Sequence, residues 1–439
     1  MRAFAFASLA VFSIGCVKGN PFEADETFTD TGGTLEVSGC EYSVTTRLGA
    51  EPPRIASLTV GEDPTPRLVH LGFVGDPKTS MVAQWRTVDE KTRATEVRYA
   101  KGANLSASEL TESGIGITFG YRSTGSTIYQ VHQGHMCDLE PGTDYSYQVG
   151  GGGRFSPVYT FRTAPDVAEN PDTEVVIGNF GDSRDGYDVW SQLVEQLAQR
   201  TPDLIVFSGD AVTVGLTQFE WEEFFARAEP LFARVPVISA HGNHEVNAVN
   251  YYSQFAMPGD QETFGFDWGH AHITVANDTP EDISYIAGKF RDAIRDDFED
   301  SKTARWKLFM HHQPMYSAST RHGSSTTLRD AWAPLIDQYK IDLVLNGHDH
   351  DYEVSKPLFN GAVQPTNATG TVYVVSGGAG AELYGNGNEF FTEYSEMTHA
   401  AATIRVTRNQ LVMDAFRQDG TAITCNTCAY PTGVSKSKP

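Results

Sequence analysis

Between residues 173 and 424, apolar runs of the kind that form buried strands alternate with segments of helical periodicity. Residues 187–200 form one such segment, with Trp190, Leu193 and Leu197 at helical spacing. Continuous apolar strands that alternate with helices need sheets covered on both faces, so the pattern predicts a layered α/β domain. Ligands of such domains bind at the carboxyl ends of the strands. The main apolar runs are TEVVIGNF, DLIVFS, VPVISA, WKLFM, IDLVLN and TVYVVSGG.

Five of these runs are followed by side chains that bind metal ions. A single Gly-Asp after a strand is usually a turn, but turns alone do not explain five polar strand ends in one domain. Carboxylates and imidazoles without thiolates suit Zn²⁺, Mn²⁺ or iron. The set exceeds what one tetrahedral ion takes, so we expect two ions. The five ends are Gly181-Asp182, Gly209-Asp210, His241-Gly242-Asn243-His244-Glu245, His311-His312 and Gly347-His348-Asp349-His350.

The composition indicates a soluble globular chain of two or three domains. It has 439 residues, of which 40% are hydrophobic and 20% charged. The formal charge of −23 argues against a nucleic acid or an anionic membrane surface as a partner. It does not exclude a small anionic substrate, because charges further apart than about 8 Å are screened at physiological salt.

The N-terminus is typical of an exported protein. Residues 1–16 form a short apolar run after one arginine, as in a signal peptide. They end in Ser13-Ile14-Gly15-Cys16, which resembles a bacterial lipoprotein cleavage box. Lipid on Cys16 would anchor the chain to a membrane in the periplasm or at the cell surface; the alternative is ordinary secretion. No later segment is long and apolar enough for a transmembrane helix. Residues 17–63 are predicted to be a tether, with one strand near Cys40.

The four remaining cysteines favour disulfides in an exported chain. Cys425 and Cys428 lie in a polar C-terminal tail, residues 425–439, so we expect a local structural bridge between them rather than a redox motif or a zinc site. The pairing of Cys40 and Cys137 stays open.

Residues 64–165 predict an all-β domain. Short β-rich runs are separated by turn signals, and helical periodicity is absent, so we expect an antiparallel sandwich. The stretch from Leu139 to Tyr147 resembles the corner of a fibronectin type III domain, and Trp85 would be the core tryptophan. His132 and His135 are interpreted as ordinary strand or turn residues. A polar linker, residues 166–173, follows.

The order of the strand-end motifs, G-D, G-D, G-N-H-E, x-x-x-H and G-H-x-H, resembles that of the purple acid phosphatases within the calcineurin-like metallophosphoesterases. The resemblance covers residues 64–424. It implies two mixed sheets flanked by helices, with the catalytic domain over residues 173–424 and two metal ions at the strand ends. It implies these metal ligands: Asp182 and His350 at the first ion, Asp210 between the ions, and Asn243, His311 and His348 at the second.

The resemblance also implies residues that contact the substrate. His244 would protonate the leaving oxygen. Arg184 is close enough to Asp182 in sequence to reach a phosphate, although a surface salt bridge is the alternative. The segment MYSASTRHGSS resembles the family's substrate loop, and His322 would contact the phosphate or the leaving group; the alternative is a solvated loop histidine.

The chain departs from the family pattern at the first ion. The family's G-D-x-x-Y has Thr213 at the tyrosine position, and its G-D-x-G ends in Arg184 here. Loss of the phenolate predicts no purple colour and a shift towards divalent ions. The first ion would keep three protein ligands, completed by Thr213 or water, so the pair would be divalent or mixed-valence iron, zinc or manganese.

Other histidines near these motifs are interpreted as structural. His312 would point away from the site, because it follows His311 along a strand. His241 and Glu245 are expected to support the ligands without binding the ions. The segment Gly269-His270-Ala271-His272 repeats the letters G-H-x-H but precedes an apolar run, so it should lie at the opposite end of the sheet.

The resulting hypothesis is a phosphatase. We expect metal-bound hydroxide to attack phosphorus in a small phosphate monoester. Two alternatives remain, namely a phosphodiesterase that uses the same site, and a surface-tethered binding lipoprotein with a decayed site. The oligomeric state is not indicated.

Overall fold

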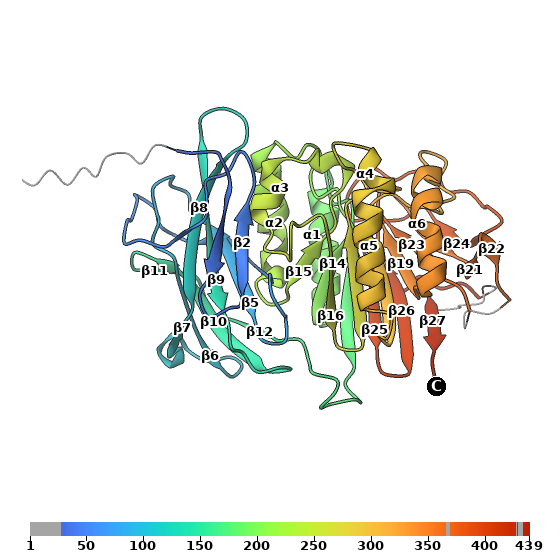
Figure 1. Ribbon diagram of the computed structural model, residues 1–439, viewed down its shortest axis with the longest axis horizontal. Helices are drawn as coiled ribbons and strands as arrows, with labels where there is room; N and C mark the ends of the chain where they lie inside the picture. The colour runs from blue at the N-terminus through green and yellow to red at the C-terminus, as the bar shows by residue number, and fades with distance from the viewer. Residues whose placement is uncertain (1–27, 366–368, 427, 429–432) are drawn as a thin grey trace, which may run out of the picture.

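The computed structural model describes residues 28–365, 369–426, 428 and 433–439. An all-β part, blue to teal in Figure 1, lies beside an α/β part, green to red. The predicted signal peptide and Cys16 lie outside the described residues. None of the helices among the described residues is long and apolar enough to span a membrane.

The all-β part is an antiparallel sandwich, as predicted. One sheet has the order β3-β8-β9-β5-β4, and the other has the order β11-β10-β6-β7 with β12 beside β10. Trp85 is fully buried in the core between them, together with Tyr147 and Phe161. The strands are β3 (Arg54–Ile55), β4 (Arg67–Gly72), β5 (Met81–Arg86), β6 (Glu96–Lys101), β7 (Glu112–Ser113), β8 (Ile115–Arg122), β9 (Ile128–Met136), β10 (Asp144–Gly151), β11 (Arg154–Phe155) and β12 (Tyr159–Arg162), with a 3₁₀ turn, η1 (Ala107–Glu109).

The prediction of a tether over residues 17–63 is wrong for residues 33–46, where two strands form instead of the one strand expected near Cys40. A hairpin of β1 (Gly33–Val37) and β2 (Tyr42–Thr46) forms there. A disulfide between Cys40 and Cys137 ties the hairpin to the end of β9. The alternation of buried Val37 and Val44 with polar residues is too short to be distinguished from a loop in the sequence.

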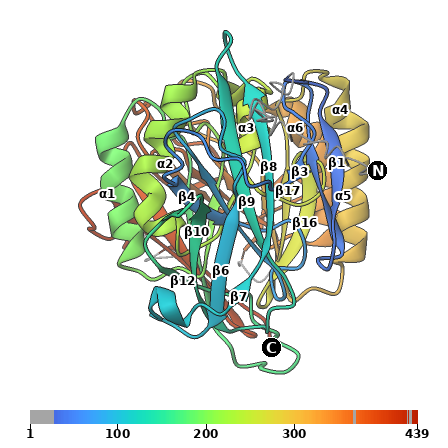
Figure 2. The same ribbon diagram turned by 90° about the vertical axis from the view of Figure 1, so that its left-hand side faces the viewer.

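The α/β part has two mixed sheets flanked by helices. The first sheet has the order β15-β14-β13-β25-β26-β27, and the second has the order β16-β17-β18-β19-β23-β20-β24. Figure 2 shows α1 and α2 on one outer side and α4 and α5 on the other. The helices are α1 (Tyr187–Ala198), α2 (Gln218–Phe232), α3 (Val249–Gln254), α4 (Ser284–Ala287), α5 (Lys289–Asp300) and α6 (Thr326–Tyr339), with a 3₁₀ turn, η2 (Asn243–Glu245).

Aromatic contacts fix the helices on the sheets. Trp190 of α1 lies 5.7 Å from Phe207 of β14 and stacks on Phe224 of α2. On the other side, Trp332 of α6 packs 5.8 Å from Phe309 of β18. The strands of the two sheets are β13 (Val175–Phe180), β14 (Leu204–Phe207), β15 (Val237–Ser239), β16 (Thr263–Trp268), β17 (Ala271–Ala276), β18 (Trp306–Met310), β19 (Leu343–Asn346), β20 (Tyr352–Ser355), β23 (Val372–Ser376), β24 (Thr392–Glu396), β25 (Ala400–Val406), β26 (Gln410–Arg417) and β27 (Val434–Ser437), and β21 (Leu358–Phe359) and β22 (Ala362–Val363) form a separate hairpin.

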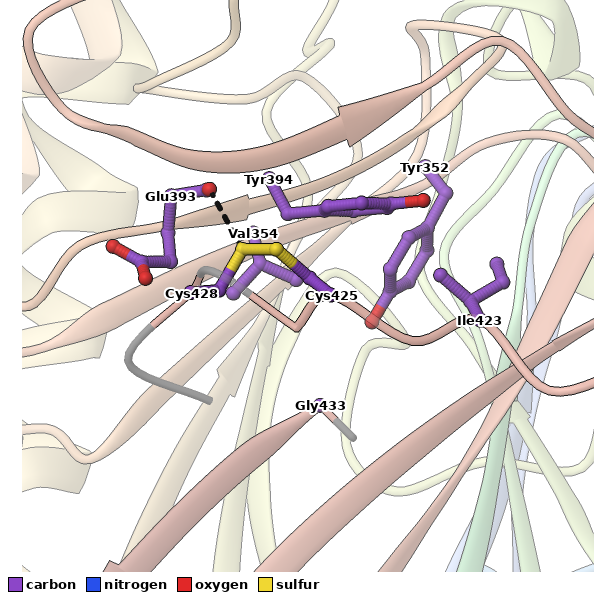
Figure 3. Close-up of a pocket in the computed structure, with 8 residues that line it drawn as sticks. All are labelled: Tyr352, Val354, Glu393, Tyr394, Ile423, Cys425, Cys428 and Gly433. Atoms are coloured by element: carbon purple, nitrogen blue, oxygen red, sulfur yellow. Dashed lines mark hydrogen bonds between the residues drawn. A yellow bond between two sulfur atoms is a disulfide. The ribbon is translucent and has the colours of Figure 1, made fainter. Parts of the chain in front are cut away.

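The C-terminal tail, residues 425–439, contains a strand that the sequence analysis did not predict. Its strand β27 pairs with β26 at the edge of the first sheet, and Val434 is fully buried. The predicted local bridge is confirmed, because Cys425 and Cys428 form a disulfide. Figure 3 shows this disulfide beside a cavity of about 20 Å³. That volume suits one water molecule and not a substrate.

Candidate metal centre

The carboxyl ends of five strands meet where the two sheets adjoin. Strands β13 and β14 are parallel neighbours that lead into Asp182 and Asp210. Both aspartates, and His348 after β19, have left-handed backbone conformations, with φ of 60°, 58° and 69°. Such conformations are costly for residues other than glycine and concentrate at functional sites. The chain therefore turns sharply at each strand end and aims its side chain at one place.

Four donors form the more compact half of the centre. The Asn243 Oδ1 atom lies 3.0 Å from His312 Nε2 and 2.9 Å from His348 Nδ1. The Asp210 Oδ1 atom lies 3.3 Å from His312 Nε2. One ligand atom each from Asp210, His312 and His348 lies within 4.8 Å of the others. We call Asp210, Asn243, His312 and His348 the compact half.

The protonation of His312 indicates that a cation belongs in the compact half. Its Nδ1 lies 2.7 Å from the Ser208 carbonyl, to which an N–H at this position donates. On the neutral ring, the Nε2 lone pair then faces the oxygens of Asn243 and Asp210, so three acceptors meet. Burial lowers the pKa of His312, but the carboxylate of Asp210 raises it well above its usual range, so the place between these atoms favours a positive charge, either a proton on Nε2 or a metal ion. A metal ion satisfies all three acceptors, so the residues fit one.

His311 does not face the centre, so the sequence prediction for this pair of histidines is reversed. The fully buried His311 ring has its Nδ1 2.9 Å from Asp278 Oδ2 and packs against Trp332. His312 holds the position expected for His311. Successive residues point to opposite faces only while the chain is extended. Strand β18 ends at Met310, so counting along the strand gives the wrong direction.

The other half consists of Asp182, His350 and Arg184, and we call it the open half. The Asp182 Oδ1 atom lies 3.5 Å from His350 Nε2. Both Asp182 Oδ1 and Asp210 Oδ2 are buried and have no hydrogen-bond partner among the described residues. Unpaired buried carboxylate oxygens are costly, so these atoms also fit a cation.

Arg184 lies in the open half, so the surface interpretation of this residue is wrong. Its side chain is 13% exposed, and its Nε is 3.7 Å from Asp210 Oδ2. Its Nη2 is 3.3 Å from His350 Nε2. The guanidinium therefore touches two of the predicted ligands of the first ion. The Thr213 hydroxyl, by contrast, donates to Asp185 and is not directed at the centre.

Two buried features keep the strand ends in place. The Glu245 carboxylate accepts backbone N–H bonds from Asp210, Ala211 and Gly242 at 2.7–2.9 Å, so it ties two ligand loops together. A Cβ at Gly347 would lie 2.3 Å from Asp182 Oδ2, so only glycine allows the segments at Gly347 and Asp182 to lie this close together. His241 also has a supporting role, since its Nε2 accepts from the Asn247 backbone.

The mouth of the centre carries His244, His322 and Tyr384. The His244 Nδ1 is 2.6 Å from the Thr213 carbonyl and its Nε2 is 3.8 Å from Asp210 Oδ2. The exposed His322 ring lies 4.3 Å from the His348 ring. The Tyr384 ring stacks on His350 at 3.9 Å. The sequence patterns do not point to Tyr384, because it lies in the loop after β23, eight residues past the end of that strand.

The segment that repeats the G-H-x-H letters is structural, as predicted. His270 Nε2 is 2.8 Å from the Pro171 carbonyl. His272 lies between Asp267 and Asp297, at 2.8 and 3.1 Å.

Comparison with known proteins agrees with this geometry. Residues 175–352 match the family described as calcineurin-like phosphoesterase, and residues 66–163 match the purple acid phosphatase N-terminal domain. The chain is 24% identical over 365 residues to purple acid phosphatase 21 of Arabidopsis thaliana, with 78% of each chain covered. It is 28% identical over 356 residues to acid phosphatase type 7 of Mus musculus, with 72% of this chain and 78% of the mouse protein covered.

A solved structure shares the fold. Purple acid phosphatase PPD1 from yellow lupin seeds matches with a TM-score of 0.72 and 16% identity, over 85% of this chain and 74% of that chain. The family matches therefore place a purple acid phosphatase N-terminal domain before a calcineurin-like phosphoesterase domain, and the chain is a metal-dependent phosphatase similar to the purple acid phosphatases.

Proposed function

We propose that the chain hydrolyses small phosphate monoesters with two metal ions, one in each half of the centre. The observation that carries the proposal is the convergence of metal-ligand candidates from five strand ends on one place, with a guanidinium at its mouth; the Asp182 Oδ1 and Asp210 Oδ2 atoms among them have no hydrogen-bond partner among the described residues. The donor set of carboxylates, amide oxygen and imidazoles suits divalent or mixed-valence manganese, zinc or iron.

The protein would contribute ligands, charge and a proton. Bound ions of this kind supply an activated water and a Lewis-acid clamp on phosphoryl oxygens. Asp210, Asn243, His312 and His348 would hold one ion, and Asp182, His350 and Asp210 the other. Arg184 carries a fixed positive charge beside Asp210, where it favours a phosphate dianion over the singly charged diester.

His244 is the candidate for the general acid. Donation from its Nδ1–H to the Thr213 carbonyl leaves Nε2 directed towards Asp210. A proton on Nε2 can then pass to a leaving oxygen at the mouth of the centre. His322, on the other side of the mouth, is a second candidate for contact with the phosphate or the leaving group.

Hydrolysis assays with matched substrates test the proposal. We expect p-nitrophenyl phosphate to be cleaved faster than bis-p-nitrophenyl phosphate, and we expect chelation to abolish cleavage of both. Faster cleavage of the diester would favour the alternative, a phosphodiesterase. If manganese, zinc or iron binds but neither ester is cleaved, the phosphatase proposal fails.

We also propose export with a lipid anchor at Cys16. The support is the sequence Ser13-Ile14-Gly15-Cys16 after an apolar run, together with the disulfides, which suit an oxidising compartment. Mass spectrometry of the mature N-terminus tests this proposal, since lipidated Cys16 supports it and an unmodified N-terminus contradicts it.

A further inference from the structure

Arg184 and a metal ion would use the same atom of His350. The His350 Nδ1 lies 2.6 Å from the Glu382 carbonyl, to which an N–H at Nδ1 donates. In this tautomer, Nε2 carries a lone pair and no proton. Arg184 Nη2 lies 3.3 Å from that nitrogen, where its N–H donates to the lone pair. One lone pair cannot accept a hydrogen bond from Arg184 and bind a metal ion at the same time.

The same guanidinium is held by two other groups. Its Nη1 lies 3.4 Å from Asp185 Oδ2, and its Nε lies 3.7 Å from Asp210 Oδ2. The Tyr384 ring stacks on the His350 ring, with the ring centroids 3.9 Å apart. Contacts with several residues therefore hold the Arg184 guanidinium in place.

The rest of the compact half has no such competitor. Arg184 reaches Asp210 only at Oδ2, and no arginine or lysine among the described residues contacts Asp210 Oδ1, Asn243 Oδ1 or the ring nitrogens of His312 and His348. The two halves therefore differ in the positive charge that they already contain. The acceptors of the compact half face one another without a cation, whereas the open half contains the Arg184 guanidinium.

We propose that Arg184 competes with the metal ion of the open half, so that the centre binds its two ions unequally. This inference rests on the proposed function, because it takes the open half as a metal site. The ion of the compact half binds first and tightly. The second ion binds only when Arg184 leaves His350, and the released guanidinium is then free to bind the phosphate of the substrate. Arg184 thus lowers the affinity for the second ion and raises the affinity for phosphate.

Manganese titration of the full chain by calorimetry tests the proposal, with Arg184→Met as the variant. For the unaltered chain we expect one tight step and one step at least tenfold weaker. Arg184→Met should tighten the weak step at least tenfold and leave the tight step unchanged. The same variant should bind inorganic phosphate more weakly. These opposite changes separate competition from a structural role, which would weaken both.

Arg321→Met is the matched control. The Arg321 guanidinium lies 5.3 Å from the centre of the Tyr384 ring, and no ion pair or hydrogen bond joins its side chain to the described metal-ligand candidates. We expect both manganese steps to stay within about twofold in this variant. If Arg184→Met does not fold, Arg184→Lys serves instead, because a shorter ammonium reaches His350 less well and should give a smaller change in the same direction.

Two results would overturn this inference and leave the proposed function standing. One is two manganese-binding steps of equal affinity in the unaltered chain, and the other is a weak step that Arg184→Met leaves unchanged or weakens further. Exchange-coupled manganese signals in electron paramagnetic resonance should appear only above the weak step, and their appearance at the tight step would also overturn it. If the unaltered chain binds no manganese, zinc or iron, the proposed function fails with it.

Discussion

The two parts of the molecule bury histidines in opposite ways. In the all-β part, His132 Nδ1 lies 2.8 Å from the Thr95 hydroxyl and Nε2 lies 3.1 Å from the Thr87 hydroxyl. Burial lowers the pKa of His132 to about 3. In the α/β part, the equally buried His312 faces a carboxylate and an amide oxygen.

The difference shows that partners, not burial, distinguish a ligand from a core residue. A hydroxyl both donates and accepts, so a neutral imidazole between two hydroxyls is fully satisfied. Carboxylate and amide oxygens only accept, so the lone pair of an imidazole nitrogen that faces them favours a positive charge there, a proton or a metal ion. The histidines of the two parts should therefore respond differently to mutation and to metal.

The largest expected effect is that of Asp210→Ala. Asp210 faces both halves of the centre, and both its oxygens lie near other ligands or Arg184. Loss of a residue that merely supports a ligand costs about 10–100-fold in affinity or activity. We therefore expect Asp210→Ala to reduce phosphatase activity by about 10³-fold or more and to remove bound metal. Retention of both would contradict the account of the centre.

The adjacent histidines give the sharpest comparison. His312→Ala should weaken metal binding by at least about 100-fold, because it removes a direct ligand of the compact half. His311→Ala should leave metal binding within a few-fold. It should instead lower the free energy of unfolding by about 1–3 kcal/mol, because the buried Asp278 carboxylate keeps only the Gln313 backbone N–H as a partner. Titration with manganese and urea denaturation measure the two effects, and the reverse result would restore the sequence prediction for this pair.

His132→Leu tests the other side of the comparison. The substitution removes two side-chain hydrogen bonds and the stacking on Trp85, so we expect a loss of about 1–2 kcal/mol in stability. Metal content and activity should be those of the unaltered chain. Loss of bound metal in a variant that still folds would contradict the distinction between the structural His132 and the metal-ligand candidate His312.

The smallest expected effect is a pH dependence of stability from His272. Burial lowers its pKa, but hydrogen bonds to Asp267 and Asp297 raise it to a net value of about 9, above the ordinary value of 6.5. The stabilisation is then complete below about pH 6.5 and is lost as the pH rises through about 9. We expect His272→Gln to remove about 1 kcal/mol of this dependence, measured by thermal unfolding between pH 6 and 10. Identical profiles for the two proteins would show that His272 is not charged.

The sequence predicted the fold class and most of the centre because both depend on local patterns. Apolar runs gave the strands, and glycine beside a polar residue marked the sharp turns at Asp182, Asp210 and His348. One strand was expected near Cys40, but the second strand of that hairpin and the edge strand β27 were missed because each has only a few alternating residues. The direction of His311 was missed because it depends on where β18 stops being extended, and Tyr384 because tertiary packing brings it onto His350.

The most direct test of the central claim is the number of metal ions that the chain binds at saturation. Elemental analysis after equilibrium dialysis against manganese, zinc or iron, at a free-ion concentration above the weak step and with the free ion subtracted, should give about two ions per chain for one of these metals. The His132→Leu variant should give the same number, and Asp210→Ala should give none. An unaltered chain that stays folded and retains none of the three metals would contradict the account.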